Sequence, residues 1–315
     1  MYTYNHKKGQ KIQTDAIGVS VDRAFLAHFQ VVAEDAVAAN TNGVMAATNL
    51  GAAVQAITAG LTSPAVPRNM QIVGNVSGIN KKVKVTGTNF AGAEIFEELT
   101  ANGTTTVVGA LAFKTVTKVD LLTQNHTPVA QVETATVAGT ISTAGNGTVT
   151  VTSALLEADE VIAVALAEND NAAAIAGKMR TAVAANVNVA EHFVISGATD
   201  KIILTAKVPA ANDTTLNIAT ADGTGEGACV GIVAAANSAN TTAGVVTDQV
   251  SVGWGDKFGL PFLLPYNTLL KTFFDGTEEA TAPTVVVDID EIEKNTVDLN
   301  STPDGAKAID IYLII

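Results

Sequence analysis

Closely spaced glycines around the chain's single tryptophan are the first residues whose spacing could do chemistry. The stretch SVGWGDKFGLP contains Gly253, Gly255 and Gly259 around Trp254. A dinucleotide-binding loop needs the spacing G-x-G-x-x-G between a strand and a helix whose amino end meets the phosphate. Here the third glycine comes one position late, and two prolines in the following LPFLLP deny a helix its early hydrogen bonds. The pattern therefore predicts a bend between a strand and an extended apolar segment, with Trp254 packed on the core.

The acidic run VVVDIDEIEK could hold a calcium ion, because carboxylate oxygens are ligands that calcium prefers. We expect Asp288 and Asp290 on one face of a strand, with Glu291 and Glu293 beyond it. The run lacks the spacing of a calcium-binding loop, however, and charge on an edge strand also prevents pairing with other chains. We interpret the run as a solvated edge and expect neither a metal nor another cofactor.

Acidic pairs, histidines and the single cysteine do not form a catalytic centre in the sequence. Glu97 is followed by Glu98, and Glu278 by Glu279, but adjacent strand residues point to opposite faces and cannot share one glycan substrate. Cys229 has no local partner for nucleophilic catalysis, and no Gly-x-Ser-x-Gly motif is present. The histidines lack the spacing of a helical metal pair; they are His6, His28, His126 and His192. We therefore expect that the protein is not an enzyme.

Charge and composition exclude several other classes of function. The 315 residues include 18 basic and 31 acidic side chains, and the net charge of -13 would repel a nucleic-acid backbone. A single cysteine rules out an intrachain disulfide, which fits assembly in a reducing compartment. No apolar run is long enough for a membrane span or a cleaved signal, so we expect neither.

The first 19 residues predict an extended N-terminal arm. This segment carries Lys7, Lys8 and Lys11 among few apolar anchors. Such a segment either docks on a partner or stays loose. The three lysines are the candidate partner-binding residues of the chain.

The elements after the arm predict a mainly β protein. In KKVKVTG, Val83 and Val85 alternate with polar residues, which is typical of a strand buried on one face. The same period places Ile309, Ile311 and Leu313 on one face near the C-terminus, together with Ile315. Frequent Asn-Gly and Asp-Gly turns between short runs favour an antiparallel β-sandwich.

Residues 134–245 differ from the rest of the chain in composition and in the order of expected elements, and they predict an inserted small α/β module. Two strand-like runs, one helix and two further strands indicate a ββαββ-like order. The helix NAAAIAGKMRTAVAAN starts behind Asn169 and Asp170, either of which could cap it, and its buried stripe is Ile175, Met179 and Val183. The core domain is then discontinuous, comprising residues 20–133 and 246–315, and the two ends of the insert should be adjacent.

Several stretches resemble a group of tailed-bacteriophage virion proteins, which include capsid decoration, or cement, proteins. The shared text is of the kind P-R-N, G-N, V-x-G-T-N, N-G-T, A-F-K-x-V-T and G-D-K-x-G-L-P. In this chain these pieces are Pro67 to Asn69, Gly74 and Asn75, Val85 to Asn89, Asn102 to Thr104, Ala112 to Thr117 and Gly255 to Pro261. Segment 134–245 resembles an α/β module that such proteins carry as an insert.

The resemblance implies a structural virion protein that is assembled in the cytoplasm of a bacterial host. The leading hypothesis is a capsid decoration protein that docks on the major capsid protein and on neighbouring copies of itself, with the lysine arm reaching to the coat. A homo-oligomer is implied, and a trimer fits capsid symmetry best, although the sequence does not show one. The alternative is a tail structural protein, either a tube or a tail-decorating subunit.

Overall fold

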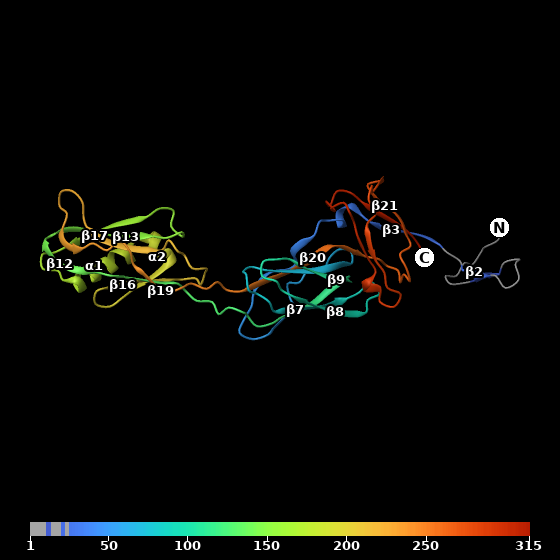
Figure 1. Cartoon of the computed structure of the whole chain (residues 1–315), viewed down its shortest axis with the longest axis horizontal. Helices are drawn as coiled ribbons and strands as arrows, with labels where there is room; N and C mark the ends of the chain where they lie inside the picture. Colours follow the sequence, from blue (N-terminus) through green and yellow to red (C-terminus); the bar gives the residue numbers. More distant parts are fainter. Residues whose placement is uncertain (1–10, 14–19, 23–24) are drawn as a thin grey trace. The chain divides into compact units, whose positions relative to one another are not determined.

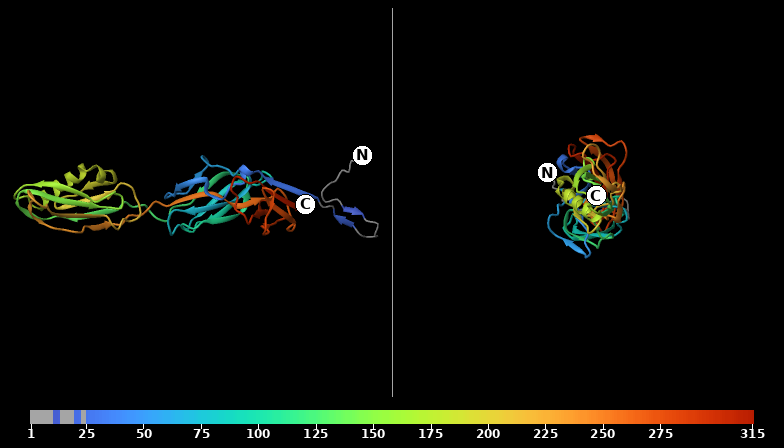
Figure 2. Two further views of the ribbon diagram at one scale, coloured as in Figure 1. Left: turned by 90° about the horizontal axis from the view of Figure 1, so that it is seen from above. Right: turned by 90° about the vertical axis from the view of Figure 1, so that its left-hand side faces the viewer.

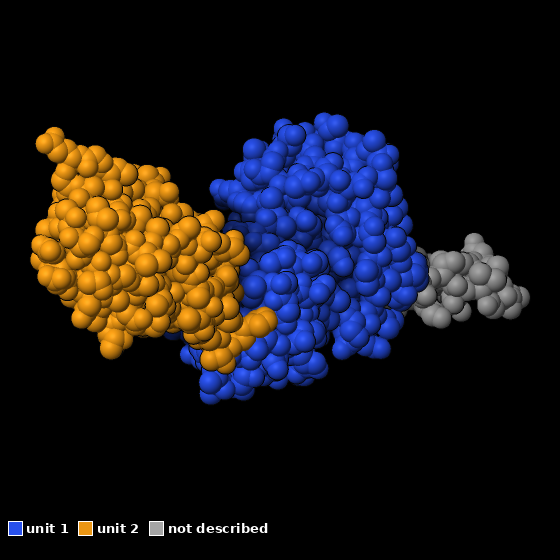
Figure 3. All heavy atoms as spheres, turned by 60° about the vertical axis from the view of Figure 1, so that its left-hand side comes forward, with its two compact units in different colours: residues 1–125, 248–315 blue, residues 126–247 orange. Residues whose placement is uncertain are grey.

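The protein is mainly β and contains several antiparallel sheets, so the prediction of a mainly β fold is confirmed. A computed structural model describes residues 11–13, 20–22 and 25–315 (Figure 1). The chain divides into two compact units, which Figure 3 distinguishes by colour. Unit 1 contains residues 1–125 and 248–315, and unit 2 contains residues 126–247.

Unit 1 is built from three main sheets and a short N-terminal strand pair. The central sheet has the order β23-β24-β20-β6-β9, with β4 also paired to β20; the outer sheet is β5-β10-β7-β8, and the terminal sheet is β22-β21-β25-β3. The strands are β1 (Lys11–Gln13), β2 (Ser20–Asp22), β3 (Leu26–Val31), β4 (Asn40–Asn49), β5 (Gln55–Ile57), β6 (Arg68–Gly74), β7 (Lys82–Thr88), β8 (Glu94–Thr100), β9 (Val107–Phe113), β10 (Thr115–Leu121), β20 (Gln249–Gly259), β21 (Leu269–Phe274), β22 (Thr277–Glu278), β23 (Thr284–Val286), β24 (Thr296–Asp298) and β25 (Ile309–Ile314).

Strand β20 joins the two hydrophobic cores of unit 1. At its start, Val250 and Val252 pack with the buried valines of β7 in the core between the central and outer sheets. At its end, Phe258 belongs to a second core, which contains Ile309 and Ile311 of the terminal sheet. One long strand therefore contributes side chains to both hydrophobic cores of this unit.

Two predicted strand patterns of unit 1 are confirmed. Val83 and Val85 of β7 are buried, while Lys82 before them is exposed and Lys84 between them is partly exposed. In β25, Ile309, Ile311 and Leu313 are fully buried on one face. The alternation of apolar and polar residues thus identifies the strand faces correctly, because each strand has one face on a core.

Unit 2 has one core that its sheets and helices share. The sheets are β15-β16-β11-β19, β14-β13-β17 and β12-β18. Figure 2 shows the helices along one side of the strands of this unit. The elements are β11 (Val132–Thr136), β12 (Ala138–Thr143), β13 (Gly145–Thr152), β14 (Glu160–Leu166), α1 (Ala172–Ala185), α2 (Val187–His192), β15 (Phe193–Ser196), β16 (Lys201–Ala206), β17 (Asn217–Asp222), β18 (Val230–Val233) and β19 (Ala239–Thr242).

The predicted helix is present as α1, and its stripe is buried. Ile175, Met179 and Val183 have no exposed surface and lie in the core of unit 2. The cap, however, is neither of the two predicted residues: Asn171 accepts the backbone N–H of Ala174 at 3.0 Å. Asp170 is engaged elsewhere, since its Oδ2 accepts the backbone N–H of Ala167 at 2.7 Å.

The two ends of unit 2 lie side by side. Val129 and Val245 form an isolated antiparallel bridge, with reciprocal backbone bonds of 3.0 and 2.9 Å. Just beyond them, in unit 1, the backbone N–H of Asn125 donates to Asp248 Oδ2 at 2.6 Å. The predicted start of the insert at residue 134 differs from the unit boundary at 126, because β11 begins at Val132 and already pairs with β16.

The residues that the structure describes include no helix that is both long enough and apolar enough to cross a membrane.

Candidate functional site

The structure places one of the three candidate partner-binding lysines. Lys7 and Lys8 lie outside the described residues, and Lys11 is the first residue of β1. Strand β1 pairs with β2 in antiparallel register, with Lys11 opposite Asp22. The predicted end of the arm at residue 19 therefore falls between two paired strands.

The glycines around Trp254 do not form a bend, so that prediction is wrong. All of them lie inside β20, which runs from Gln249 to Gly259. A Cβ at Gly253 would overlap the backbone of Asn40 in β4, and one at Gly255 would lie 2.7 Å from the side-chain amide of Asn69. These glycines are needed because neighbouring chain segments approach β20 closely.

Trp254 packs on the core between the central and outer sheets, as predicted. A Cβ at Gly43 of β4 would lie 2.6 Å from its six-membered ring, so the indole lies directly over this glycine. The indole N–H donates to the carbonyl oxygen of Ala38 at 3.3 Å. The tryptophan is therefore a structural residue of unit 1.

The acidic run forms a turn rather than the predicted strand face. Strand β23 ends at Val286, and Asp288 Oδ1 accepts the backbone N–H groups of Asp290 and Glu291 at 2.8 and 2.9 Å. The turn is organised by Asn295, whose amide bonds to the backbone of Asp288 and Glu291. Nowhere in the described chain do three or more His, Cys, Asp or Glu residues form a group that could hold a metal ion.

The acidic pairs point to different partners, as predicted. Glu97 Oε1 accepts the backbone N–H of Ala110 at 2.7 Å, whereas Glu98 pairs with Lys82 at 2.9 Å. Glu278 likewise binds Lys271, while Glu279 accepts the hydroxyl of Thr272. Neither pair can hold one substrate between its two carboxyl groups.

The cysteine is buried in unit 2. Burial raises the pKa of the Cys229 thiol, and a hydrogen bond to Asp222 at 3.5 Å raises it further. A thiol of this kind is a poor nucleophile, because the thiolate is the reactive form.

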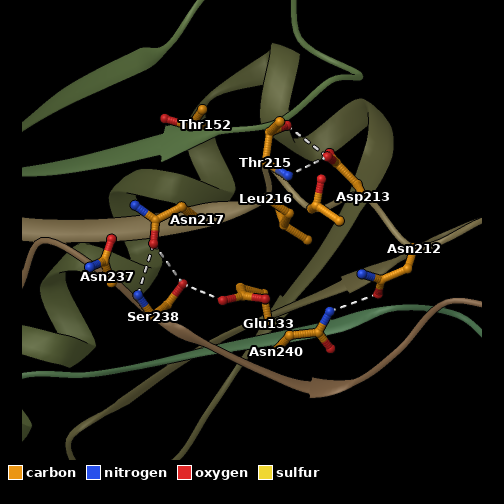
Figure 4. A pocket seen from close by; sticks show the side chains of 11 residues that line it. Glu133, Thr152, Asn212, Asp213, Thr215, Leu216, Asn217, Asn237, Ser238 and Asn240 are labelled. Carbon is orange, nitrogen blue, oxygen red and sulfur yellow. Dashed lines mark hydrogen bonds between the residues drawn. The ribbon is translucent and has the colours of Figure 1, made fainter.

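A polar cavity of about 610 Å³ lies between the edges of two sheets in unit 2 (Figure 4). Strand β17 is an edge of the β14-β13-β17 sheet, and β19 is an edge of the β15-β16-β11-β19 sheet. The segments that lead into these strands bring amide, hydroxyl and carboxyl groups together. The lining residues are Glu133, Thr152, Asn212, Asp213, Thr214, Thr215, Leu216, Asn217, Asn237, Ser238 and Asn240.

Glu133 supplies a buried carboxyl group to this cavity. Its side chain is 3% exposed, and its Oε1 accepts the hydroxyl of Ser238 at 2.5 Å. The Ser238 backbone N–H donates to Asn217 Oδ1 at 2.8 Å, so the three side chains form one connected wall (Figure 4). Glu133 Oε2 has no hydrogen-bond partner among the described residues. A buried acceptor without a donor costs free energy.

Asp213 fixes another side of the cavity. Its Oδ1 accepts the backbone N–H and the hydroxyl of Thr215 at 2.8 and 2.7 Å, and its Oδ2 accepts the Ser153 hydroxyl and the Ala154 N–H, both at 2.8 Å. Burial raises the pKa of Asp213, but these hydrogen bonds outweigh it and hold the pKa below its ordinary value. The carboxylate is thus ionised at neutral pH and holds the segment in place.

Other polar groups of the cavity have no hydrogen-bond partner among the described residues. Asn240 Nδ2 donates to Asn212 Oδ1 at 2.7 Å, which fixes both amides and leaves the Asn240 oxygen and the Asn212 nitrogen without a partner among the described residues. The hydroxyls of Thr152 and Thr214 and the amide of Asn237 likewise have none there. The cavity therefore offers both donors and acceptors. This site was not predicted from the sequence, where its one local signal is the density of Asn, Ser and Thr in ANDTT and NSANTT.

An exposed apolar face covers the outer side of the terminal sheet in unit 1. Leu26 is 67% exposed and Leu270 is 51% exposed, and together with Lys271, Phe273 and Tyr312 they line a hollow of about 490 Å³. The Tyr312 ring stacks on His28, with centroids 4.6 Å apart, and meets Phe273 edge-on at 5.7 Å. Large apolar groups gathered on one face are typical of a protein-interaction surface.

Comparison of the chain with protein-family models, with curated proteins and with solved structures finds no match.

Proposed function

We propose that the protein is a structural component of a tailed-bacteriophage virion, and that it decorates the capsid. The supporting observation is the exposed apolar face of the terminal sheet, residues Leu26, Leu270, Lys271, Phe273 and Tyr312. In this proposal the face docks on the major capsid protein or on a neighbouring copy of the chain. Many copies on a lattice make each modest contact sufficient, because repeated contacts add avidity.

The N-terminal segment extends this docking surface in the proposal. Strand β3, which contributes Leu26 to the apolar face, follows β1 and β2 along the chain, and Lys11 is the first residue of β1. The lysines give this segment a charge opposite to the net charge of the chain, -13. They would therefore pair with acidic groups on the coat or on an adjacent copy, and copies would associate as a homo-oligomer, for which a trimer suits the capsid.

Binding of the purified chain to heads that lack it tests the proposal. A deletion of residues 1–19 and the variant Leu270→Asp should each reduce occupancy strongly, because they remove the lysines and interrupt the apolar face. The matched control is Val194→Asp, at an apolar residue that is 52% exposed in unit 2. Occupancy that is unchanged in both test variants would contradict the docking surface.

Gold labelling of intact particles decides where the protein resides. Label on the head supports capsid decoration, whereas label confined to the tail assigns the chain to a tail structural protein instead. Particles without any label would overturn the virion assignment. Light scattering of the purified chain measures the oligomeric state, and a monomer at every concentration would contradict the self-association part of the proposal.

A further inference from the structure

We propose that the polar cavity of unit 2 is a binding site for a neutral saccharide. Its volume of about 610 Å³ is within the range of small-molecule sites. The site is formed wholly by residues of unit 2, from β11, the end of β13, and the segments around β17 and β19. The inference is independent of a capsid role, because no residue of the docking surface takes part in it.

The hydrogen-bonding groups of the cavity match sugar hydroxyls. A hydroxyl both donates and accepts, and the free groups of the cavity are of both kinds. The Asn240 oxygen, the Asn212 nitrogen and the hydroxyl of Thr152 are held at the wall without partners among the described residues. Glu133 closes the wall behind these groups through its bond to the Ser238 hydroxyl.

Charge excludes anionic ligands from this site. Asp213 is ionised at neutral pH and Glu133 is a second carboxyl group of the lining. Of the described residues that line the cavity, none is a lysine, an arginine, a histidine or an aromatic residue. A phosphate would therefore meet no cation and a nucleobase no ring to stack on. Leu216 provides an apolar contact for the C–H face of a sugar ring.

Saturation-transfer difference NMR on the full chain tests the site with two neutral probes, maltose and N,N′-diacetylchitobiose. Transfer to at least one probe is expected. Thr152→Val removes one unpartnered hydroxyl without changing the shape of the side chain, and should weaken binding about fivefold, the equivalent of one neutral hydrogen bond. The triple variant Thr152→Val, Thr214→Val, Asn237→Ala should weaken it about a hundredfold if the losses add.

Thr150→Val is the matched control, because Thr150 lies two residues before Thr152 in β13 and does not line the cavity. Circular dichroism establishes that each variant remains folded. The proposal is overturned if neither probe receives saturation, if the triple variant binds as well as the control, or if glucose 6-phosphate binds more tightly than maltose. Displacement of the sugar by calcium would also overturn it, since the cavity would then be a cation site.

Discussion

Asn295 makes four side-chain hydrogen bonds in unit 1, and its removal gives a quantitative test of the packing. Its side chain is fully buried. Oδ1 accepts the backbone N–H groups of Leu264 and Asp288 at 3.3 and 2.9 Å, and Nδ2 donates to the carbonyl oxygens of Asp288 and Glu291 at 2.7 and 3.0 Å. The substitution Asn295→Ala removes all four bonds and leaves the Asp288 N–H without a partner, whereas the Leu264 N–H and the carbonyl oxygens of Asp288 and Glu291 keep backbone partners. At about 1 kcal/mol for each bond, the free energy of unfolding of unit 1 should fall by about 4 kcal/mol.

The assay is urea unfolding followed by the fluorescence of Trp254, which lies in unit 1 and is the only tryptophan of the chain. The matched control is Asn267→Ala, because exposed Asn267 makes one side-chain bond, to the backbone N–H of Leu269 at 3.0 Å. The control should lose about 1 kcal/mol or less. If Asn295→Ala and Asn267→Ala have the same midpoint and the same slope, the four bonds do not stabilise unit 1 and the reasoning is refuted.

Three further substitutions test the packing and the electrostatics. Gly177→Ala should stabilise unit 2 by about 1 kcal/mol in urea unfolding followed by circular dichroism, because the new Cβ meets only the end of the Arg180 side chain, at 3.6 Å; a loss of stability would contradict this. Gly253→Ala should destabilise unit 1 by about 3 kcal/mol or more in the fluorescence assay, because its Cβ would overlap the Asn40 backbone, and a neutral result would mean that β4 and β20 are not in contact. Burial raises the pKa of Glu97, although the N–H of Ala110 opposes this, so the native state binds this proton more tightly than the unfolded chain. The contribution of the Glu97 carboxyl group to the stability of the native state therefore falls as the pH rises through the raised pKa. The stability of Glu97→Gln relative to the wild type should consequently increase from about pH 4 to about pH 7. A difference in urea midpoint that stays constant over this range would show that the pKa of Glu97 is not perturbed.

The strand faces and the main helix could be predicted from the sequence because their signals are local. Val83 and Val85 alternate with lysines over a few residues, and the one-sided burial of β7 follows from that period alone. In α1, the burial of Met179 likewise follows from the helical spacing of the apolar residues. The cap needed more than local information: Asn169, Asp170 and Asn171 are all suitable residue types, and Asn169 has a positive φ of 70° that the sequence does not reveal.

The β20 region was predicted incorrectly because segments that are distant in the sequence require glycine at these positions. Read locally, Gly253 and Gly255 indicate a bend. In the structure they keep strand geometry, and it is Asn40 and Asn69, more than 180 residues away in sequence, that leave no room for a side chain. The prediction for the acidic run was wrong for a different reason: Asn295 directly follows the run, and its bonds to the backbone of Asp288 hold the chain in a turn after β23.

The polar cavity could not be predicted, since its wall is assembled from segments that only the fold brings together. Glu133 and Ser238 are 105 residues apart and meet because β19 pairs with β11. Asn217 joins them from a different sheet. Each is an ordinary polar residue in its own segment, and the buried, partly unpaired carboxyl group is visible only when all three are in place.

The two proposals can be tested separately because the units share no core. The core of unit 2 draws its residues from Ala135 to Ile232, and both cores of unit 1 consist of residues outside that range. Thr152 contributes to the cavity without belonging to the core of unit 2, and Leu270 contributes to the apolar face without belonging to the cores of unit 1. A variant at either position therefore changes a surface while leaving the packing beneath it unchanged. Loss of sugar binding with normal attachment to heads, or the reverse, would assign each activity to its own unit.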